Sequence, residues 1–259
     1  MIPRTPIGDT GLSLPPLGFG AFKIGRNEGI KYPSGYDLPS DAEVDRLLNR
    51  VLDLGCTLID TAPAYGISEE RIGRHLAGRR SEFVLSTKVG ETFADGKSTY
   101  DFSETGVRRS LERSRARLQS DVLDIVLIHS PGNDREILET TPVVEVLCDY
   151  RDRGVIRAIG LSGKTVDGAQ SALAWADVLM VEFHAEDSSH EAVIDEAARD
   201  RVAVIVKKGL GSGRLPPDRA IPFVLGQQGV TSLVVGSLNE AHFQSNWELA
   251  LRCRRDSAG

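Results

Sequence analysis

Short apolar segments with the composition of β-strands alternate with segments of helical periodicity along the whole chain. Most of these strand-like segments are apolar at nearly every position. Continuous apolar strands are typical of a parallel sheet that is covered on both faces. The pattern predicts an α/β protein with a closed (β/α)8 TIM barrel, and a doubly wound open sheet is the alternative. The expected strands are residues 17–22, 57–60, 83–88, 122–129, 156–163, 178–183, 202–208 and 232–237.

The segments around these strands complete the barrel prediction. Residues 1–14 contain Gly8-Asp9-Thr10-Gly11 between short apolar groups, which predicts an N-terminal β-hairpin at the bottom of the barrel. Ser40 with Glu43 forms a capping box, and Ser68 is expected to cap the helix after the second strand. Residues 23–39, residues 89–102 and the polar segment after residue 129 are expected to be long loops. We expect residues 1–259 to form a single domain.

Overall charge and cysteine content limit the classes of function. The 259 residues carry a formal net charge of −6 and the sequence pI is about 5.5, so neither nucleic acid nor a membrane surface is an expected partner. The sequence has no apolar signal core and no run of membrane-spanning length, so a cytoplasmic protein is expected. Cys56, Cys148 and Cys253 are far apart and lack metal-type spacing, which favours reduced thiols and no metal site. A monomer or a weak homo-oligomer is expected, because no excess of apolar positions marks an interface.

Three apolar strands end on an ionisable residue. Asp60, Lys88 and His129 close the second, third and fourth expected strands, and Tyr65 lies in the turn after Asp60. An ionisable side chain at the end of a buried strand is costly unless it is paired. In an α/β barrel the carboxyl ends of the strands meet at one face, so these four residues are expected to meet at one rim. Taken singly, each also has an ordinary structural explanation as a cap, a packing aromatic, a rim ion pair or a core histidine.

Asp60, Tyr65, Lys88 and His129, in this order, resemble the catalytic tetrad of the aldo-keto reductase superfamily. The resemblance extends over nearly the whole chain through Asp60–Gly66, Ser86–Lys88, Leu127–His129, Ile159–Ser162 and Gly236–Ser237. It implies NAD(P)H-dependent reduction of an aldehyde or ketone, with a small-molecule carbonyl substrate. Tyr65 would be the general acid, Lys88 would lower its pKa, Asp60 would anchor Lys88, and His129 would orient the carbonyl.

On the cofactor side this chain departs from the family pattern. The resemblance assigns Ser162 to the nicotinamide carboxamide, but the residue after it is Gly163 and the family glutamine is replaced by Met180. Lys207 stands where an aromatic residue usually stacks on the nicotinamide. The loop Gly209, Leu210, Gly211, Ser212 and Gly213 is expected to cradle the pyrophosphate.

The resemblance assigns the far end of the nucleotide to the region after the eighth strand, at Gly236, Ser237, Asn239, His242 and Asn246. The basic pair that meets the 2′-phosphate in NADP-preferring members is replaced here by Gly236 and His242. NADP(H) is still favoured over NAD(H), because the family usually uses it and Lys207, Lys208 or Arg214 could compensate.

Three other functions remain open. The Gly163, Met180 and Lys207 departures are compatible with a non-catalytic, nucleotide-binding protein of regulatory role. Lys88 could form a Schiff base in a barrel lyase, although Asp60 beside it opposes this. Asp60, His129 and His184 could serve a metal-dependent hydrolase, although Lys88 would repel a cation. Loops at 31–36, 93–100 and 131–138 are expected to wall the substrate pocket, and no basic cluster in the sequence marks an acidic substrate.

Overall fold

The computed structural model describes residues 2–30 and 32–256, and their main feature is the expected closed parallel barrel. Its strands pair in chain order and the ring closes where β12 pairs with β3, at Leu233 and Leu17. The closure confirms the (β/α)8 prediction and rules out the open doubly wound sheet. The barrel strands are β3 (Leu17–Gly20), β4 (Leu58–Asp60), β5 (Val84–Val89), β8 (Leu123–His129), β9 (Ile156–Ser162), β10 (Val178–Glu182), β11 (Ala203–Lys207) and β12 (Val230–Val235).

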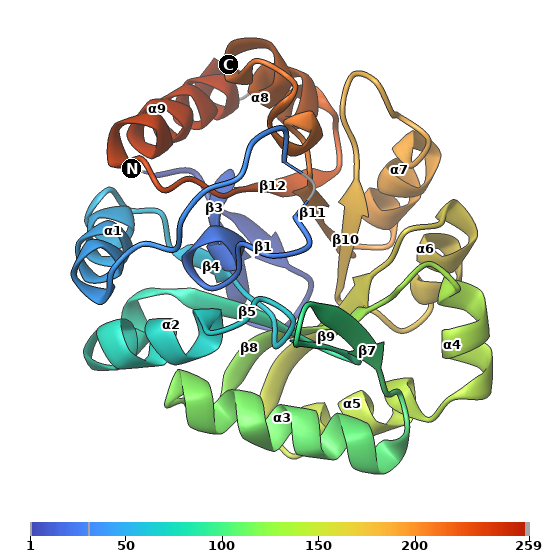
Figure 1. Ribbon diagram of the computed structural model, residues 1–259. Coiled ribbons are helices and arrows are strands. Elements are labelled where there is room, and N and C mark those ends of the chain that lie inside the picture. The colour runs from blue at the N-terminus through green and yellow to red at the C-terminus, as the bar shows by residue number, and fades with distance from the viewer. Residues whose placement is uncertain (1, 31, 257–259) are drawn as a thin grey trace.

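The helices form a ring around the barrel (Figure 1). They are α1 (Asp41–Asp53), α2 (Ser68–Leu76), α3 (Glu104–Leu118), α4 (Asp134–Thr140), α5 (Val143–Asp152), α6 (Val166–Ala172), α7 (Glu191–Arg199), α8 (Pro217–Gly226) and α9 (Glu240–Asp256). Short 3-10 helices follow β3 (η1, Ala21–Ile24), α2 (η2, Ala77–Glu82) and β11 (η3, Gly211–Gly213). The capping box at the start of α1 is confirmed, since Ser40 accepts from the Glu43 N–H and Glu43 accepts from the Ser40 N–H.

Two apolar clusters hold these layers together. The larger lies between the barrel and the helices, where Phe243 and Trp247 of α9 pack against the strands. The smaller fills the barrel interior, where Leu58 and Ile125 meet side chains of the N-terminal hairpin. That hairpin pairs β1 (Thr5–Ile7) with β2 (Leu12–Leu14), and its buried Ile7 confirms that it closes the barrel. The polar groups at the opposite end of the barrel are therefore left to line the site.

Several expected boundaries were wrong. Strand β3 stops at Gly20, and β12 runs from Val230 to Val235, two residues earlier than expected. Ser68 is the first residue of α2 and does not cap it: its hydroxyl donates to the Ala21 carbonyl at 2.8 Å and accepts from Thr61 at 2.9 Å. The Ser68 hydroxyl therefore makes buried tertiary hydrogen bonds instead of the helix cap that the local pattern predicts.

Two of the expected loops contain secondary structure. Residues 89–102 include an antiparallel hairpin of β6 (Glu91–Ala94) and β7 (Lys97–Tyr100), whose turn residues Asp95 and Gly96 both have positive φ. Such a turn matches the twist of the strands it joins. The polar segment after His129 contains helix α4, which the sequence analysis missed. None of the described helices is both long and apolar enough to cross a membrane.

Candidate active site

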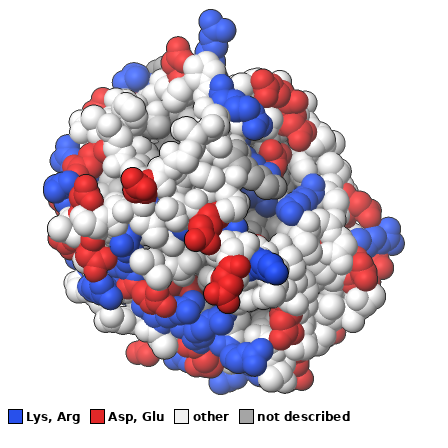
Figure 2. Space-filling view, viewed as in Figure 1, with Lys and Arg blue, Asp and Glu red and all other residues white. Residues whose placement is uncertain are grey.

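A cavity of about 400 Å³ opens at the carboxyl ends of the barrel strands. Figure 2 shows a hollow near the middle of this face, with Lys and Arg side chains beside it. Its wall includes Tyr65 from the turn after β4, His129 from the end of β8, and Lys207 from the end of β11. Asp60 also reaches the wall, so the structure brings the predicted catalytic residues to one rim, as expected.

Lys88 and Asp60 form a buried ion pair. Nζ of Lys88 lies 2.8 Å from each carboxylate oxygen of Asp60 and donates to the Thr61 carbonyl at 2.8 Å. Ser86 donates a further hydrogen bond to Asp60 at 2.9 Å. Burial by itself would lower the pKa of Lys88, but the charge of Asp60 outweighs burial, so the pKa lies above its usual value. Lys88 is therefore a permanent cation, as the sequence analysis expected.

Tyr65 packs directly against this cation. Its ring centroid lies 4.8 Å from Nζ of Lys88 and 5.1 Å from the ring of Phe22, which meets it edge-on. Burial raises the pKa of Tyr65 to about 12, and the Lys88 charge opposes the rise without cancelling it. The expectation of a lowered Tyr65 pKa is therefore wrong, because desolvation of the phenolate outweighs the nearby ammonium.

His129 has a partner that the sequence analysis missed. Its Nδ1 lies 2.8 Å from Oε2 of Glu91, on strand β6, and Ser98 of β7 donates to the other Glu91 oxygen at 2.6 Å. Burial would raise the pKa of Glu91, but His129, Ser98 and Arg26 outweigh it and hold the pKa at about 2. Burial lowers the pKa of His129, and the Glu91 charge only partly opposes this. At neutral pH the pair is thus an ionised Glu91 against a neutral imidazole.

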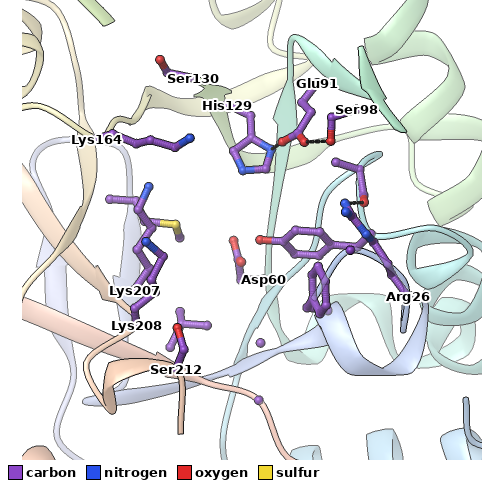
Figure 3. A pocket seen from close by; sticks show the side chains of 18 of the residues that line it. Arg26, Asp60, Glu91, Ser98, His129, Ser130, Lys164, Lys207, Lys208 and Ser212 are labelled. Carbon is purple, nitrogen blue, oxygen red and sulfur yellow. Dashed lines mark hydrogen bonds and ion pairs between the residues drawn. The ribbon is translucent and has the colours of Figure 1, made fainter. Parts of the chain in front are cut away.

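Three lysines from two segments of the chain line one wall of the cavity. Figure 3 shows Lys164, Lys207 and Lys208 on this wall, with Arg26, Glu91 and His129 across the cavity. Lys164 follows β9, whereas Lys207 and Lys208 end and follow β11. The sequence analysis saw no basic cluster because Lys164 lies 43 positions before the adjacent Lys207 and Lys208.

Lys207 also contacts the residues assigned to the nicotinamide. Its Nζ donates to Ser162 Oγ at 2.9 Å and to the Gly163 carbonyl at 2.7 Å. Burial and then the charges of Lys208 and Lys88 lower the pKa of Lys207 to about 7. Lys208 is ion-paired with Glu182. Met180 lines the same part of the cavity and offers no amide.

The glycine-rich loop after β11 is tightly turned. Gly211, Ser212 and Gly213 have φ of +55°, +57° and +89°, in the left-handed region. The N–H groups of Gly211 and Gly213 donate within the loop, to the carbonyls of Lys208 at 2.7 Å and Leu210 at 2.9 Å. Ser212 lines the cavity, whereas Gly209 packs against the core, where an added Cβ would lie 2.6 Å from Leu233.

Most of the residues assigned to the far end of the nucleotide do not line the cavity. Gly236 lines the cavity, but Ser237, Asn239, His242 and Asn246 do not. Asn239 caps α9, because its side-chain oxygen accepts from the His242 N–H at 3.0 Å. Asn246 is buried, and Ser237 is bonded to the backbone of Asn239. Their part in binding a nucleotide stays a prediction.

The expected pocket walls are present in part. Tyr32 lines the cavity from the loop at 23–39, and Ser98 and Tyr100 line it from β7. Lys31, which the first of these loops included, lies outside the described residues. Of residues 131–138 none lines the cavity, although Ser130 does. Across the part of the chain that the structure describes, no three His, Cys, Asp or Glu side chains lie close enough to hold a metal ion.

The structure thus combines a closed (β/α)8 barrel with a buried Lys–Asp pair, a tyrosine and a histidine at its mouth. The chain belongs to the aldo/keto reductase family, whose model matches residues 16–220, well over half of the sequence.

A solved structure resembles nearly the whole chain, whereas curated relatives match about two thirds of it. A solved structure from Pseudomonas aeruginosa, assigned to the aldo-keto reductases, is 43% identical with a TM-score of 0.89, over 97% of this chain and 96% of that one. D-threo-aldose 1-dehydrogenase from a Pseudomonas species is 30% identical over 66% of this chain and 56% of its own length. Aldo-keto reductase YhdN from Bacillus subtilis is 35% identical over 63% of this chain and 47% of its own. The chain thus matches about half the length of these curated relatives.

Proposed function

We propose that this protein is an NAD(P)H-dependent oxidoreductase that interconverts a small aldehyde or ketone and its alcohol, with Tyr65 as the general acid. One observation carries the proposal: the buried Lys88–Asp60 pair lies against the Tyr65 ring at the mouth of a substrate-sized cavity. The names of relatives such as D-threo-aldose 1-dehydrogenase support alcohol–carbonyl chemistry.

The raised pKa of Tyr65 suits an acid. With a pKa of about 12 the phenol keeps its proton at neutral pH and holds it for the carbonyl oxygen. When the proton leaves, the phenolate faces the ammonium of Lys88, which stabilises it. Asp60 keeps Lys88 charged and in place through both carboxylate oxygens. Solvent then returns the proton to Tyr65 after the alcohol leaves.

The chain offers a fitting set of groups for the nicotinamide nucleotide, which supplies or accepts the hydride when bound. The Ser162 hydroxyl accepts from Lys207, so it still has its own hydrogen to donate to a carboxamide oxygen. Lys208, together with Lys207 in its protonated form, places positive charge beside the glycine-rich loop, where a pyrophosphate would lie. Leu210 and Ser212 are the loop residues whose N–H groups we assign to that contact.

For the adenosine end we propose NADP(H) over NAD(H). Lys208 is paired with Glu182 and Lys207 with Ser162, so the exposed Arg214 is the cation we assign to the 2′-phosphate. Titration with NADPH and with NADH, followed by nucleotide emission, tests this. Tighter binding of NADPH that Arg214→Gln removes supports the assignment, and equal affinities contradict it.

A second function, nucleotide binding without catalysis, is favoured by one observation. Lys207 stands where the family stacks an aromatic ring, and it already engages Ser162 and Gly163. A panel of aldehydes, ketones and sugars, assayed with Tyr65→Phe as the control, separates the two functions. Turnover that falls about a hundredfold or more in Tyr65→Phe, with unchanged nucleotide affinity, supports the oxidoreductase. Nucleotide binding with no turnover on the panel would favour the binding protein.

A further inference from the structure

Lys207 is a cavity-facing lysine to which the proposed reduction gives no proton-transfer role. It ends strand β11, and its side chain passes β10 to reach Ser162 at the end of β9. Figure 3 shows it on the cavity wall with Lys164 and Lys208. The environment of a buried amine decides whether it is a cation or a nucleophile.

The contacts of Lys207 differ in kind from those of its neighbours. Its Nζ is held by two neutral oxygens, Ser162 Oγ at 2.9 Å and the Gly163 carbonyl at 2.7 Å. Among the residues that the structure describes, no carboxylate oxygen lies within 4.0 Å of it. Lys88 is paired with Asp60, and Lys208 with Glu182. The Lys207 amine is therefore placed against the cavity without a counter-ion to keep it protonated.

We propose that Lys207 is a carbonyl-reactive amine, which condenses with small aldehydes entering the cavity to form an imine. The amine is available at neutral pH, because burial and the nearby cations lower the pKa of Lys207 to about 7. Around it, Lys88 and Lys208 lower this pKa and Asp134 and Glu182 raise it. The other titratable groups near it are His129, His190 and Lys164 of the same cavity wall.

The condensation needs no oxidant, reductant or metal. The nitrogen lone pair attacks the carbonyl carbon, a C–N bond forms, and the carbonyl oxygen takes up a proton to give a carbinolamine. That oxygen then leaves as water and a C=N bond forms. The two protons in the water come from the nitrogen, so no net proton is taken up or released. Ser162 Oγ, 2.9 Å from the nitrogen, is placed to pass a proton from nitrogen to the departing oxygen.

This chemistry replaces the lyase expectation for Lys88. All of the contacts around Lys88 stabilise its ammonium form, which is not nucleophilic. The imine also forms without a nicotinamide nucleotide, so the inference stands or falls separately from the proposed oxidoreductase function.

The experiment is reductive trapping on the intact protein. The protein is incubated at pH 7 with limiting butanal and sodium cyanoborohydride and no nucleotide, and then digested and mapped by mass spectrometry. We expect an added mass equal to butanal less one oxygen atom, at Lys207, at least about tenfold faster than at any other lysine. The advantage follows because a surface lysine, with a pKa near ~10.4, is almost wholly protonated at pH 7.

Two variants and a pH series complete the test. Lys207→Arg keeps the charge and should lose the fast site, whereas the matched Lys208→Arg should keep it. Labelling of Lys207 should level off above about pH 8, while that of surface lysines should keep rising. Labelling spread evenly over the lysines, or concentrated at Lys88, overturns the proposal. Mapping of the wild-type protein decides this even where Lys207→Arg does not fold.

Discussion

Oε2 of Glu91 lies 2.8 Å from Nδ1 of His129 and joins the β6–β7 hairpin to the end of β8. A carboxylate at Nδ1 favours the tautomer with hydrogen on Nδ1 and leaves Nε2 as a hydrogen-bond acceptor. Neutral His129 can then accept from an alcohol, but it must be protonated to donate to a carbonyl oxygen. If the proposed function holds, the hairpin influences how well His129 serves each direction of the reaction.

Glu91→Gln should disturb catalysis without removing a group that we assign to proton transfer. The amide is neutral, so it no longer favours one tautomer or raises the pKa of His129. We expect turnover to fall roughly ten- to a hundredfold, less than for Tyr65→Phe. NMR of ¹⁵N-labelled histidine should show the Nδ1–H form in the wild type and a mixture in the variant. An unchanged tautomer and pH profile would mean that Glu91 acts only in packing.

Glu91 should also contribute to stability in a pH-dependent way. Its folded pKa of about 2 lies below its ordinary value of 4.5, so its contribution is complete above pH 4.5 and is lost as the pH falls toward 2. The Glu91 side chain is only 11% exposed, so solvent screens this contribution little. Urea unfolding of wild type and Glu91→Gln should therefore show a free-energy gap at pH 7 that narrows at pH 3. A gap that does not change with pH contradicts this account.

Removing one partner of the Lys88–Asp60 pair should lower the free energy of unfolding more than removing both partners. Asp60→Asn alone leaves a buried ammonium without its counter-ion, and should lower the free energy of unfolding by about 3–5 kcal/mol. The double variant Asp60→Asn with Lys88→Met removes both charges and should recover part of that loss. Urea unfolding of the four proteins in this cycle measures the coupling. Additive losses would show that the pair is not coupled in the folded protein.

Gly66 should be essential to the position of Tyr65. It has φ of +62°, and a Cβ on it would lie 2.1 Å from the carbonyl oxygen of Gly25. Gly66→Ala should therefore destabilise the protein by more than ~1 kcal/mol and reduce turnover, because the Tyr65 turn has to move. Gly78→Ala is the matched control, since a Cβ there meets nothing within 4 Å. Comparison of the two melting temperatures and activities checks this.

The barrel could be predicted from the sequence because its signals are local. Apolar strands ending in Asp60, Lys88 and His129 placed three side chains at the same rim before any contact was known. The hairpin at 91–100 also had a local signal, the Asp95-Gly96 pair between polar and aromatic residues, but the segment was interpreted as a loop. Glu91 itself had none: nothing near it in sequence shows that it meets His129, 38 positions further on.

The three lysines on the cavity wall also could not be predicted as a cluster from local sequence. Lys164 and Lys207 become neighbours only because β9, β10 and β11 lie side by side in the barrel. The lowered pKa of Lys207 likewise depends on burial and on Lys88, which is four strands away around the ring. The raised pKa of Tyr65 depends on how completely the turn is buried, and residue types alone do not report that.

Among residues 2–30 and 32–256, the β6–β7 hairpin pairs only with itself and shares no backbone hydrogen-bonding edge with the barrel sheet. Glu91, which affects the tautomer and pKa of His129, thus lies on a hairpin outside the barrel sheet. Asp60 and Lys88 lie on barrel strands, and Tyr65 lies in the turn after β4. Under the proposed function, insertions or substitutions in this hairpin would change the balance between oxidation and reduction and leave the barrel strands unchanged. Sequence changes in the hairpin can therefore alter the protonation of His129 without altering Tyr65, Lys88 or Asp60.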